Sequence, residues 1–174
     1  MANVAKIAGE ITFVEHPLEP VFDESSRVLI LGTMPSPKSR EVGFYYGHPQ
    51  NRFWRVLAAL FNEPLPATNE ERRALILRHH LALWDVCASC EIAGASDASL
   101  RHAQSNDLAR IFRVAPIEQV VTTGKTAARL YKKLLQPQYP ELPLLELPST
   151  SAANAAMSLD ALIEAYRPIA NVEK

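Results

Sequence analysis

The stretch RVLILG, residues 27–32, decides the fold. Its consecutive apolar residues end on a glycine, and a short apolar run of this kind is typical of a strand buried on both faces. Two prolines in the next segment, TMPSPKS at 33–39, predict a loop there. In open α/β sheets the loops at the carboxyl ends of the strands bind ligands, so this loop is the first candidate for a functional site.

Three further strands alternate with helices along the rest of the chain. The strand patterns are LALWDV, EQVVTT and PLLEL, at 81–86, 118–123 and 143–147. Helices are expected at about 51–61, from the Thr68/Glu71 capping box to about 79, from Asn106 or Asp107 to about 113, from Gly124 to about 135, and in a last segment ending near 166. This order predicts a three-layer α/β/α fold around a central, mostly parallel four-stranded sheet.

The chain of 174 residues, 1–174, is expected to form a single domain. Residues 1–26 are acidic and contain Pro17 and Pro20, so they are predicted to be a lead-in to the first strand. Residues 87–106 show no clear hydrophobic periodicity and include Gly94 and many small polar residues, which predicts a long loop.

The net charge is −1, from 18 basic and 19 acidic residues, which argues against a generic basic nucleic-acid binder. Positive charge is nevertheless concentrated in 27–60, where Glu41 is the only acid and the bases are Arg27, Lys38, Arg40, Arg52 and Arg55. No apolar run approaches the roughly 18 residues of a membrane span. The first ten residues lack the pattern of a secretory signal, so we expect a cytoplasmic protein without a membrane partner.

Cys87 and Cys90 form a C-x-x-C pair, which leaves a thiol redox domain as a less favoured alternative. Two cysteines are too few for a disulfide framework or a zinc site of their own, and the five histidines show no ligand spacing to them. We therefore expect no metal. The chain also lacks the motifs G-x-G-x-x-G, G-x-x-x-x-G-K-[ST] and G-x-S-x-G, which argues against a Rossmann dehydrogenase, a P-loop kinase and an esterase.

Two loops contain candidate binding groups, and those of the first suit a flat, anionic ligand. The first contains the aromatic run Phe44, Tyr45 and Tyr46 close to Lys38 and Arg40, although two of these rings could equally belong to the core. His48 in the same loop is more often structural than catalytic. The second loop, PSTSAAN at 148–154, precedes a helix, so its serines could bind a phosphate or Ser151 could simply cap the helix.

Taken together, GTMPSPKS…FYYGHPQNRFW at 32–54 and LPSTSAANA at 147–155 resemble the uracil-DNA glycosylase superfamily, most closely its hypoxanthine-DNA (deoxyinosine) glycosylase branch. The first stretch matches the opening motif, a strand followed by G-x-x-P-[SG], and then a P-x-N-x-F-W segment. The second matches a closing motif in which Leu-Pro-Ser replaces the His-Pro-Ser or Asn-Pro-Ser of other branches. LWDVCASCEIAGASDASL at 83–100 resembles the middle segment of the branch.

The resemblance implies a uracil-DNA glycosylase-like fold, a substrate of DNA containing a deaminated base, and no organic cofactor or metal. The uracil-cleaving branches place an Asp or Asn in the opening motif to handle the attacking water, whereas this chain reads Gly32-Thr33-Met34-Pro35. Leu147 also stands where other branches have a histidine. The resemblance therefore implies that Asn51 does the catalytic work and makes uracil the less favoured base.

The residues expected to act on such a substrate fall into two groups. The base-binding group is Met34, Pro35, Phe44, Tyr45, Tyr46 and Asp85. The DNA-binding group is Ser36, Lys38, Arg52, Ser149, Thr150, Ser151 and Asn154, and Asn154 or Ala153 could fill the gap left by a flipped base. Asp85 would accept a hydrogen bond from N1–H of hypoxanthine, which adenine lacks; its alternative role is a helix cap or an ion pair with an arginine.

Hydrolysis is expected to pass through a transition state that resembles an oxocarbenium ion. The carbonyl oxygen of Asn51 would orient the water, and backbone N–H groups near Met34 to Ser36 would stabilise the departing base. Without a lysine nucleophile in a motif position, the enzyme would be monofunctional, and it is expected to be monomeric. The alternatives are a uracil- or mismatch-specific glycosylase and a nucleic-acid-binding module without catalysis.

Overall fold

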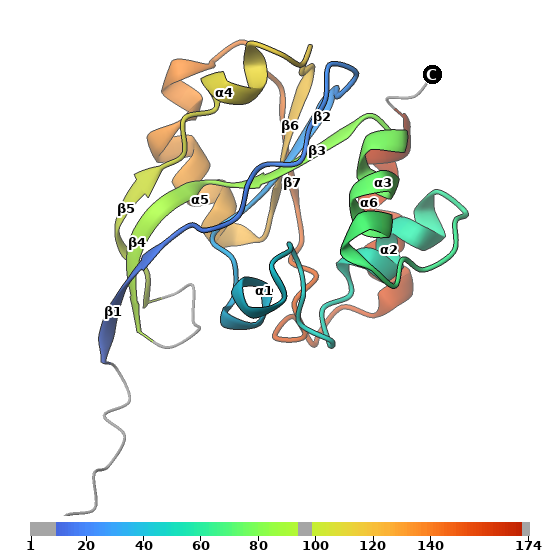
Figure 1. The fold of residues 1–174 in the computed structure, drawn as a ribbon, viewed down its shortest axis with the longest axis horizontal. Coiled ribbons are helices and arrows are strands. Elements are labelled where there is room, and N and C mark those ends of the chain that lie inside the picture. Colours follow the sequence, from blue (N-terminus) through green and yellow to red (C-terminus); the bar gives the residue numbers. More distant parts are fainter. Residues whose placement is uncertain (1–9, 94–98, 172–174) are drawn as a thin grey trace, which may run out of the picture.

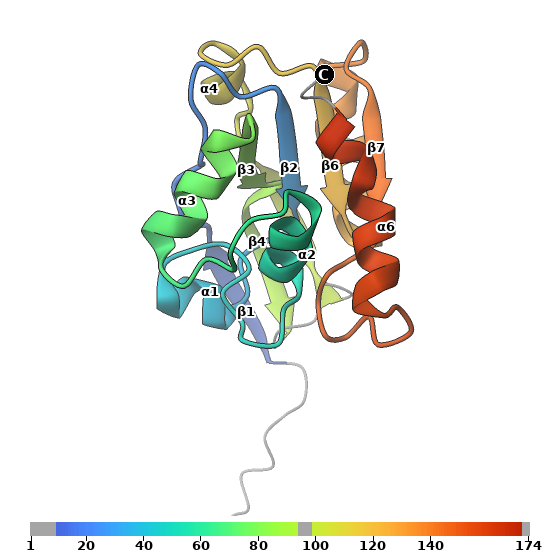
Figure 2. The same ribbon diagram turned by 90° about the vertical axis from the view of Figure 1, so that its right-hand side faces the viewer.

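A four-stranded parallel sheet forms the centre of the molecule. The computed structural model describes residues 10–93 and 99–171. Strands β2 (Val28–Gly32), β3 (Leu81–Asp85), β6 (Gln119–Thr123) and β7 (Leu144–Leu147) lie in the order β3-β2-β6-β7, all parallel (Figure 2). Strands β2 and β3 are buried along their whole length, as expected for strands covered on both faces. The predicted three-layer α/β/α fold is confirmed.

Helices cover both faces of this sheet. Helices α2 (Phe53–Leu60), α3 (Asn69–Arg78) and α6 (Leu159–Ala170) lie on one side, and α4 (Ala109–Phe112) and α5 (Lys125–Leu134) on the other (Figure 1). A short 3₁₀ turn at Gln136–Gln138 follows α5. The predicted capping box of α3 is present, because the Thr68 side chain accepts from Glu71 N–H and the Glu71 side chain accepts from Thr68 N–H.

A second, antiparallel sheet occupies the segment that was expected to be a loop. Strands β1 (Ile11–Glu15), β4 (Cys87–Ala93) and β5 (Arg101–Ser105) pair in the order β1-β4-β5. The loop prediction for 87–106 is therefore wrong over its described residues, whereas Gly94 lies outside them. The hydrophobic pattern fails here because β4 consists largely of small residues, and because its pairing with β5 shifts register between Cys87 and Ser89.

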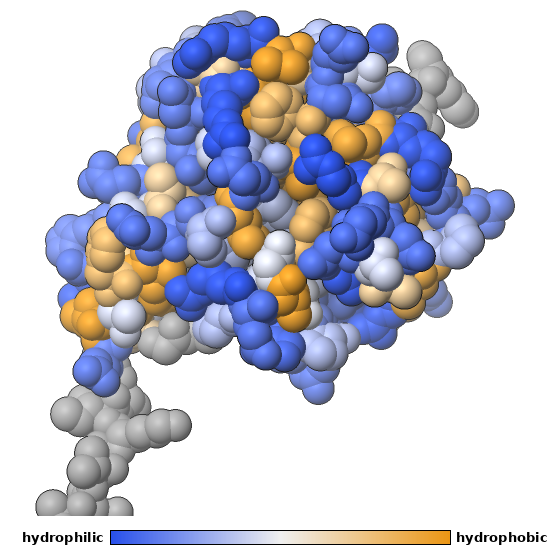
Figure 3. Space-filling model, in the orientation of Figure 1, coloured by the Kyte–Doolittle hydropathy of each residue, from blue (hydrophilic) through white to orange (hydrophobic). Residues whose placement is uncertain are grey.

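The described part of the acidic lead-in is also built into the fold. Strand β1 pairs with β4 along its whole length, and an isolated bridge joins Val21 to Leu83 of β3. Apolar side chains gather at the end of the molecule where β1 lies (Figure 3). Ile11 and Phe13 are the exposed large apolar residues of this strand. Val14 faces the other way and is buried with Cys90 and Ile92. Ile11–Glu15 thus belong to the second sheet, and Val21 ties the following segment to the main sheet, so this region is more than a simple lead-in.

Three helix boundaries differ from the expectation. Residues 37–42, predicted as loop, form helix α1 (Pro37–Val42), with Ser36 as N-cap and the proline at the first helical position. Helix α4 begins at Ala109, whose backbone N–H donates to the Asp107 side chain, the second of the two predicted caps. Asn106 does not cap the helix, because its side chain donates to the carbonyls of Asp85 and Cys87. Helix α6 continues past residue 166 to Ala170, since Pro168 lies in its last turn and breaks the helix only there.

Candidate active site

A cavity of about 500 Å³ lies at the carboxyl ends of β2, β3 and β6. These ends point towards the part of the molecule that holds α1 and β1 (Figure 2). Val14 and Ile92 from the second sheet complete one wall. Of the residues predicted to act on the substrate, the cavity is lined by Met34, Pro35, Ser36, Tyr45, Tyr46, Asn51, Asp85, Ser149, Thr150 and Ser151. Phe44, Lys38, Arg52 and Asn154 do not line it, and Arg40, His48 and Ala153 do.

Asn51 joins the two motif segments. Its Oδ1 accepts hydrogen bonds from the backbone N–H of Phe53 and from the Thr150 hydroxyl, both at 2.9 Å. The backbone N–H can only donate, so the atom facing it is the oxygen and the orientation of the amide is fixed. Nδ2 bonds to no residue within 10–93 or 99–171 and remains as a donor beside the cavity. This differs from the expectation that the carbonyl oxygen orients water, because both lone pairs of that oxygen are already engaged.

Arg52 forms hydrogen bonds within the protein. Its guanidinium donates to the carbonyl oxygens of Ser151, Asn154 and Met157, and its backbone N–H donates to Thr150 O. These bonds attach the loop that follows β7 to the start of α2. The structure therefore places the guanidinium on carbonyls of this loop rather than at the cavity, where the sequence analysis expected a DNA contact.

The three consecutive aromatic residues lie in different surroundings. Phe44 packs edge-on against Tyr45, with ring centroids 5.7 Å apart, and faces Trp54. Tyr45 is 2% exposed, and its hydroxyl donates to Glu19 O. Tyr46 stacks on Phe53 at a centroid distance of 3.8 Å, and its hydroxyl lies 3.1 Å from Thr123 Oγ1. Tyr46 is less buried than Tyr45, the other tyrosine that lines the cavity. It is therefore the ring best placed to stack on a base.

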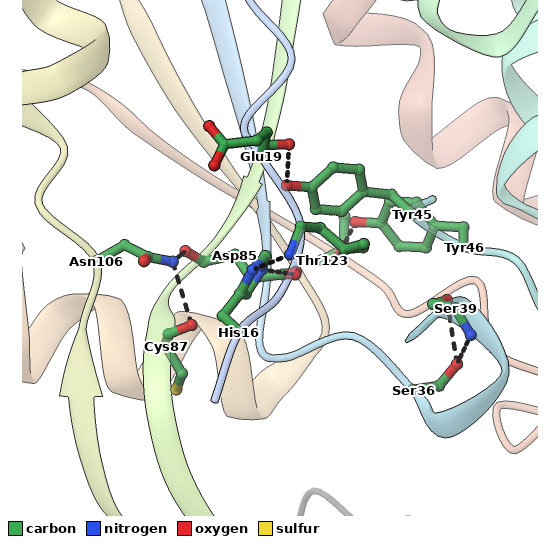
Figure 4. Close-up of polar contacts among 11 residues, drawn as sticks. His16, Glu19, Ser36, Ser39, Tyr45, Tyr46, Asp85, Cys87, Asn106 and Thr123 are labelled. Atoms are coloured by element: carbon green, nitrogen blue, oxygen red, sulfur yellow. Dashed lines mark hydrogen bonds and ion pairs between the residues drawn. The ribbon is translucent and has the colours of Figure 1, made fainter. Parts of the chain in front are cut away.

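Asp85 ends β3 and lies on the floor of the cavity. It is 4% exposed, and its Oδ2 bonds to His16 Nε2 at 2.7 Å (Figure 4). A Cβ on Gly32 would come within 2.5 Å of Oδ1, so only glycine leaves room for the carboxylate against β2. Among the described residues, Asp85 neither caps a helix nor pairs with an arginine. Sequence reasoning missed His16, which stands in the lead-in with no local motif around it.

Burial and the nearby carboxylate of Asp85 raise the pKa of both tyrosines that line the cavity. Burial and then the nearby negative charge of Asp85 raise the pKa of Tyr45 far above its usual value of 10. The same two causes raise the pKa of Tyr46, and the hydrogen bond with Thr123 only partly opposes them. Both phenols therefore keep their protons at physiological pH and remain hydrogen-bond donors beside Asp85.

Hydroxyl groups around the mouth of the cavity are arranged by short local bonds. Ser36 Oγ caps α1 by accepting from Ser39 N–H. Ser149 Oγ accepts from Ser151 N–H, and Ser151 Oγ accepts from Ala153 N–H. Helix α6 begins only at residue 159, capped by Ser158, so the expected helix N-terminus at Ser149–Ser151 is absent because turns occupy 151–157. Ser149 and Ser151 therefore line the cavity without the free N–H groups of a helix N-terminus beside them.

The two basic residues of α1 differ in their contacts. Lys38 pairs with Glu41 at 3.1 Å on the outer side of the helix. Arg40 lines the cavity, and its Nε is buried without a partner among the described residues. Arg40 belongs to the basic segment 27–60 but is not among the residues predicted from the sequence to contact the substrate.

Other kinds of site receive no support from the described part of the chain. Both cysteines are fully buried, Cys87 in the main core and Cys90 in the smaller cluster under β1, so neither is exposed as a redox thiol requires. Within the described ranges, no group of three or more His, Cys, Asp or Glu side chains could hold a metal ion. The helices there are all too short or too polar to cross a membrane.

The comparison with known protein families decides the assignment. Residues 19–169 match the model of the uracil DNA glycosylase superfamily. The chain belongs to the uracil DNA glycosylase superfamily. It is therefore a DNA glycosylase, an enzyme that hydrolyses the N-glycosyl bond between a base and its sugar.

Individual members of the superfamily are similar over most of the chain. The hypoxanthine DNA glycosylase of Methanosarcina barkeri is 34% identical over 137 residues, which are 78% of this chain and 85% of that protein. That of Methanosarcina acetivorans is 32% identical over 139 residues, 79% and 87% of the two chains. The solution NMR structure of a candidate uracil DNA glycosylase from Methanosarcina acetivorans superposes with a TM-score of 0.79 at 26% identity, covering 94% of this chain and all of that one.

Proposed function

We propose that this superfamily member is a monofunctional DNA glycosylase that releases hypoxanthine from deoxyinosine in DNA, as the first step of base-excision repair. The observation that supports it most is the buried carboxylate of Asp85 on the floor of a cavity large enough for a base. Two relatives that are about a third identical are named for hypoxanthine.

Base recognition follows from the chemistry of a carboxylate. An ionised carboxylate can only accept hydrogen bonds, and hypoxanthine offers N1–H where adenine offers a lone pair. A buried acceptor facing the adenine lone pair is left unsatisfied, which costs about 1–3 kcal/mol or more. Asp85 thus favours the deaminated base over the adenine from which it arises. The base must leave the helical stack to reach the cavity, and Tyr46 is placed to stack on it.

Hydrolysis needs the sugar, the water and the departing base to be held in line. Asn51 contributes a fixed donor, Nδ2, and we propose that it holds the attacking water or a sugar oxygen by donation rather than by accepting a proton. Met34 and Ser36 line the cavity, and we propose that their backbone N–H groups stabilise negative charge on the purine. Ser36, Ser149, Ser151 and Arg40 surround its mouth and suit phosphate oxygens.

The test is a cleavage assay on labelled duplexes that carry one deoxyinosine, one deoxyuridine or only undamaged bases. Alkali added afterwards reveals abasic sites. We expect strand breaks with deoxyinosine alone, and only after alkali. Product from deoxyuridine would instead support the uracil or mismatch reading, and breaks before alkali would contradict a monofunctional enzyme. Absence of product from every duplex would overturn the proposed activity.

A further inference from the structure

We propose that His16 is a positioning residue for base selection: it fixes the carboxylate of Asp85 so that Oδ1 is the atom offered to the base. The proposal rests on the proposed function, because it assigns the base-reading role to Asp85. It concerns a residue that lies ahead of the range 19–169 matched by the family model.

The hydrogen bonds of His16 define where its proton lies. Nδ1 accepts from the backbone N–H of Leu18 at 3.2 Å, so it carries a lone pair rather than a proton. The proton of the neutral ring is therefore on Nε2, which donates to Asp85 Oδ2 at 2.7 Å. Both side chains are withdrawn from solvent, with 2% and 6% of their surface exposed. Water therefore has little access to replace this contact.

The contact makes the two carboxylate oxygens different. Oδ2 is engaged by His16, while Oδ1 lies against Gly32, close to where the Tyr46 hydroxyl and the cavity meet. A terminal carboxylate torsion is broad and nearly two-fold, so an unbonded Asp side chain could rotate and present either oxygen at a changed angle. Among the side chains that the structure describes, His16 alone bonds to this carboxylate. The histidine is thus what holds the acceptor in one orientation.

The second sheet places His16 accurately. Its backbone N–H donates to Ala88 O directly after the β1–β4 ladder, which ends with the pair Glu15–Ser89. A few residues later, Val21 and Leu83 exchange backbone hydrogen bonds across an isolated bridge to β3. The chain is therefore attached on one side of His16 to β4 and on the other to β3, the strand that ends at Asp85. Figure 4 shows the imidazole reaching the carboxylate from this segment.

Two substitutions separate the contacts of the imidazole. His16→Asn keeps a polar group near the place of Nδ1 and can satisfy Leu18 N–H, but it is too short to reach Asp85. His16→Gln places an amide N–H near the position of Nε2 and can still donate to Asp85. The matched control is His102→Gln, because His102 bonds to Glu91 at the same 2.7 Å but is 77% exposed and outside the cavity.

The experiment measures kcat and KM on deoxyinosine and undamaged duplexes, together with the melting temperature of each variant. We expect His16→Asn to lose about 10- to 100-fold in kcat/KM for deoxyinosine, as for a lost bond to a charged group, and to discriminate less well against adenine. His16→Gln should recover most of both, and His102→Gln should match the unmodified protein. Adding Asp85→Ala to His16→Asn should cause no loss beyond that of Asp85→Ala alone, because His16 acts through Asp85.

Each failure has a distinct signature. If the unmodified protein does not release hypoxanthine, the proposed function falls, and this proposal with it. If it does but His16→Asn keeps full activity and selection, the function stands and His16 is not a positioning residue. Equal losses in the Asn and Gln variants, in step with their melting temperatures, would show a purely structural histidine. Losses that add in the double variant would show that His16 does not act through Asp85.

Discussion

Asn51 has its amide oriented by contacts on the oxygen alone, which leaves one chemical role for its exposed end. Phe53 N–H and the Thr150 hydroxyl both donate to Oδ1. These partners come from the start of α2 and from the loop after β7, so the side chain is fixed only when both motif segments are in place. A group that is pre-positioned in this way is effective in catalysis because little reorganisation accompanies the reaction.

Replacement of Asn51 by Asp tests whether the Nδ2 donor is the active part. The substitution keeps an oxygen towards Phe53 and Thr150 and removes the N–H groups on the other side. We expect a loss of about 100- to 1,000-fold in kcat, the range for removal of one pre-positioned donor. Asn69→Asp is the control, because Asn69 Nδ2 donates to Val42 O away from the cavity. A rate equal to or above that of the unmodified protein would show that an acceptor for water is what the site needs.

The elements that the sequence predicts well are those whose signal lies within a few consecutive residues. Strands β2 and β3 are runs of apolar residues buried on both faces, and a capping box marks the start of helix α3. Strand β4 has no such pattern, because it depends on pairing with β1, some 80 residues away in sequence. His16 could not be predicted for the same reason: its partner Asp85 is 69 residues distant, and only the register of β1 on β4 brings the two together.

Glu63, in the loop between α2 and α3, forms a charge cluster with Arg78 and His79 at the end of α3, and this cluster predicts acid sensitivity. Hydrogen bonds from Arg78 and then His79 lower the pKa of Glu63 from 4.5 to about 2. A carboxyl group with a lowered pKa in the folded state stabilises that state above the pKa of the unfolded chain, and the contribution disappears as pH falls through the lower value. The unfolding free energy should therefore decrease between about pH 4.5 and pH 2 more in the unmodified protein than in Glu63→Gln. Urea denaturation across this range would measure it, and parallel curves would contradict it.

At the scale of the whole molecule, the charge distribution determines which residues can bind the phosphates of DNA. The net charge of −1 gives no general attraction to a polyanion, so binding has to come from local groups. Five of the bases fall within 27–60, but the structure shows that several of them serve the fold or pair with acids. Arg40 is the cation of that segment that lines the cavity. It is therefore the strongest candidate for a phosphate contact close to the flipped nucleotide.

Arg40→Gln should weaken DNA binding in a salt-dependent way. Each phosphate contact releases counterions, so the logarithm of the affinity falls with the logarithm of salt concentration by about 0.9 per contact on duplex DNA. Loss of one contact should lower affinity for damaged and undamaged duplexes alike and reduce the magnitude of that slope by about 1. Fluorescence anisotropy from about 50 to 200 mM salt would measure both quantities.

The control for this measurement is Lys132→Gln. Lys132 lies in the last turn of α5 and pairs with Glu146 at 2.9 Å. Neither Lys132 nor Glu146 lines the cavity, so this substitution removes a positive charge outside the site. Both substitutions remove one positive charge, so only a contact with phosphate separates them. Equal slopes for the two variants would mean that Arg40 acts through net charge alone, and that the DNA backbone follows another path across the molecule.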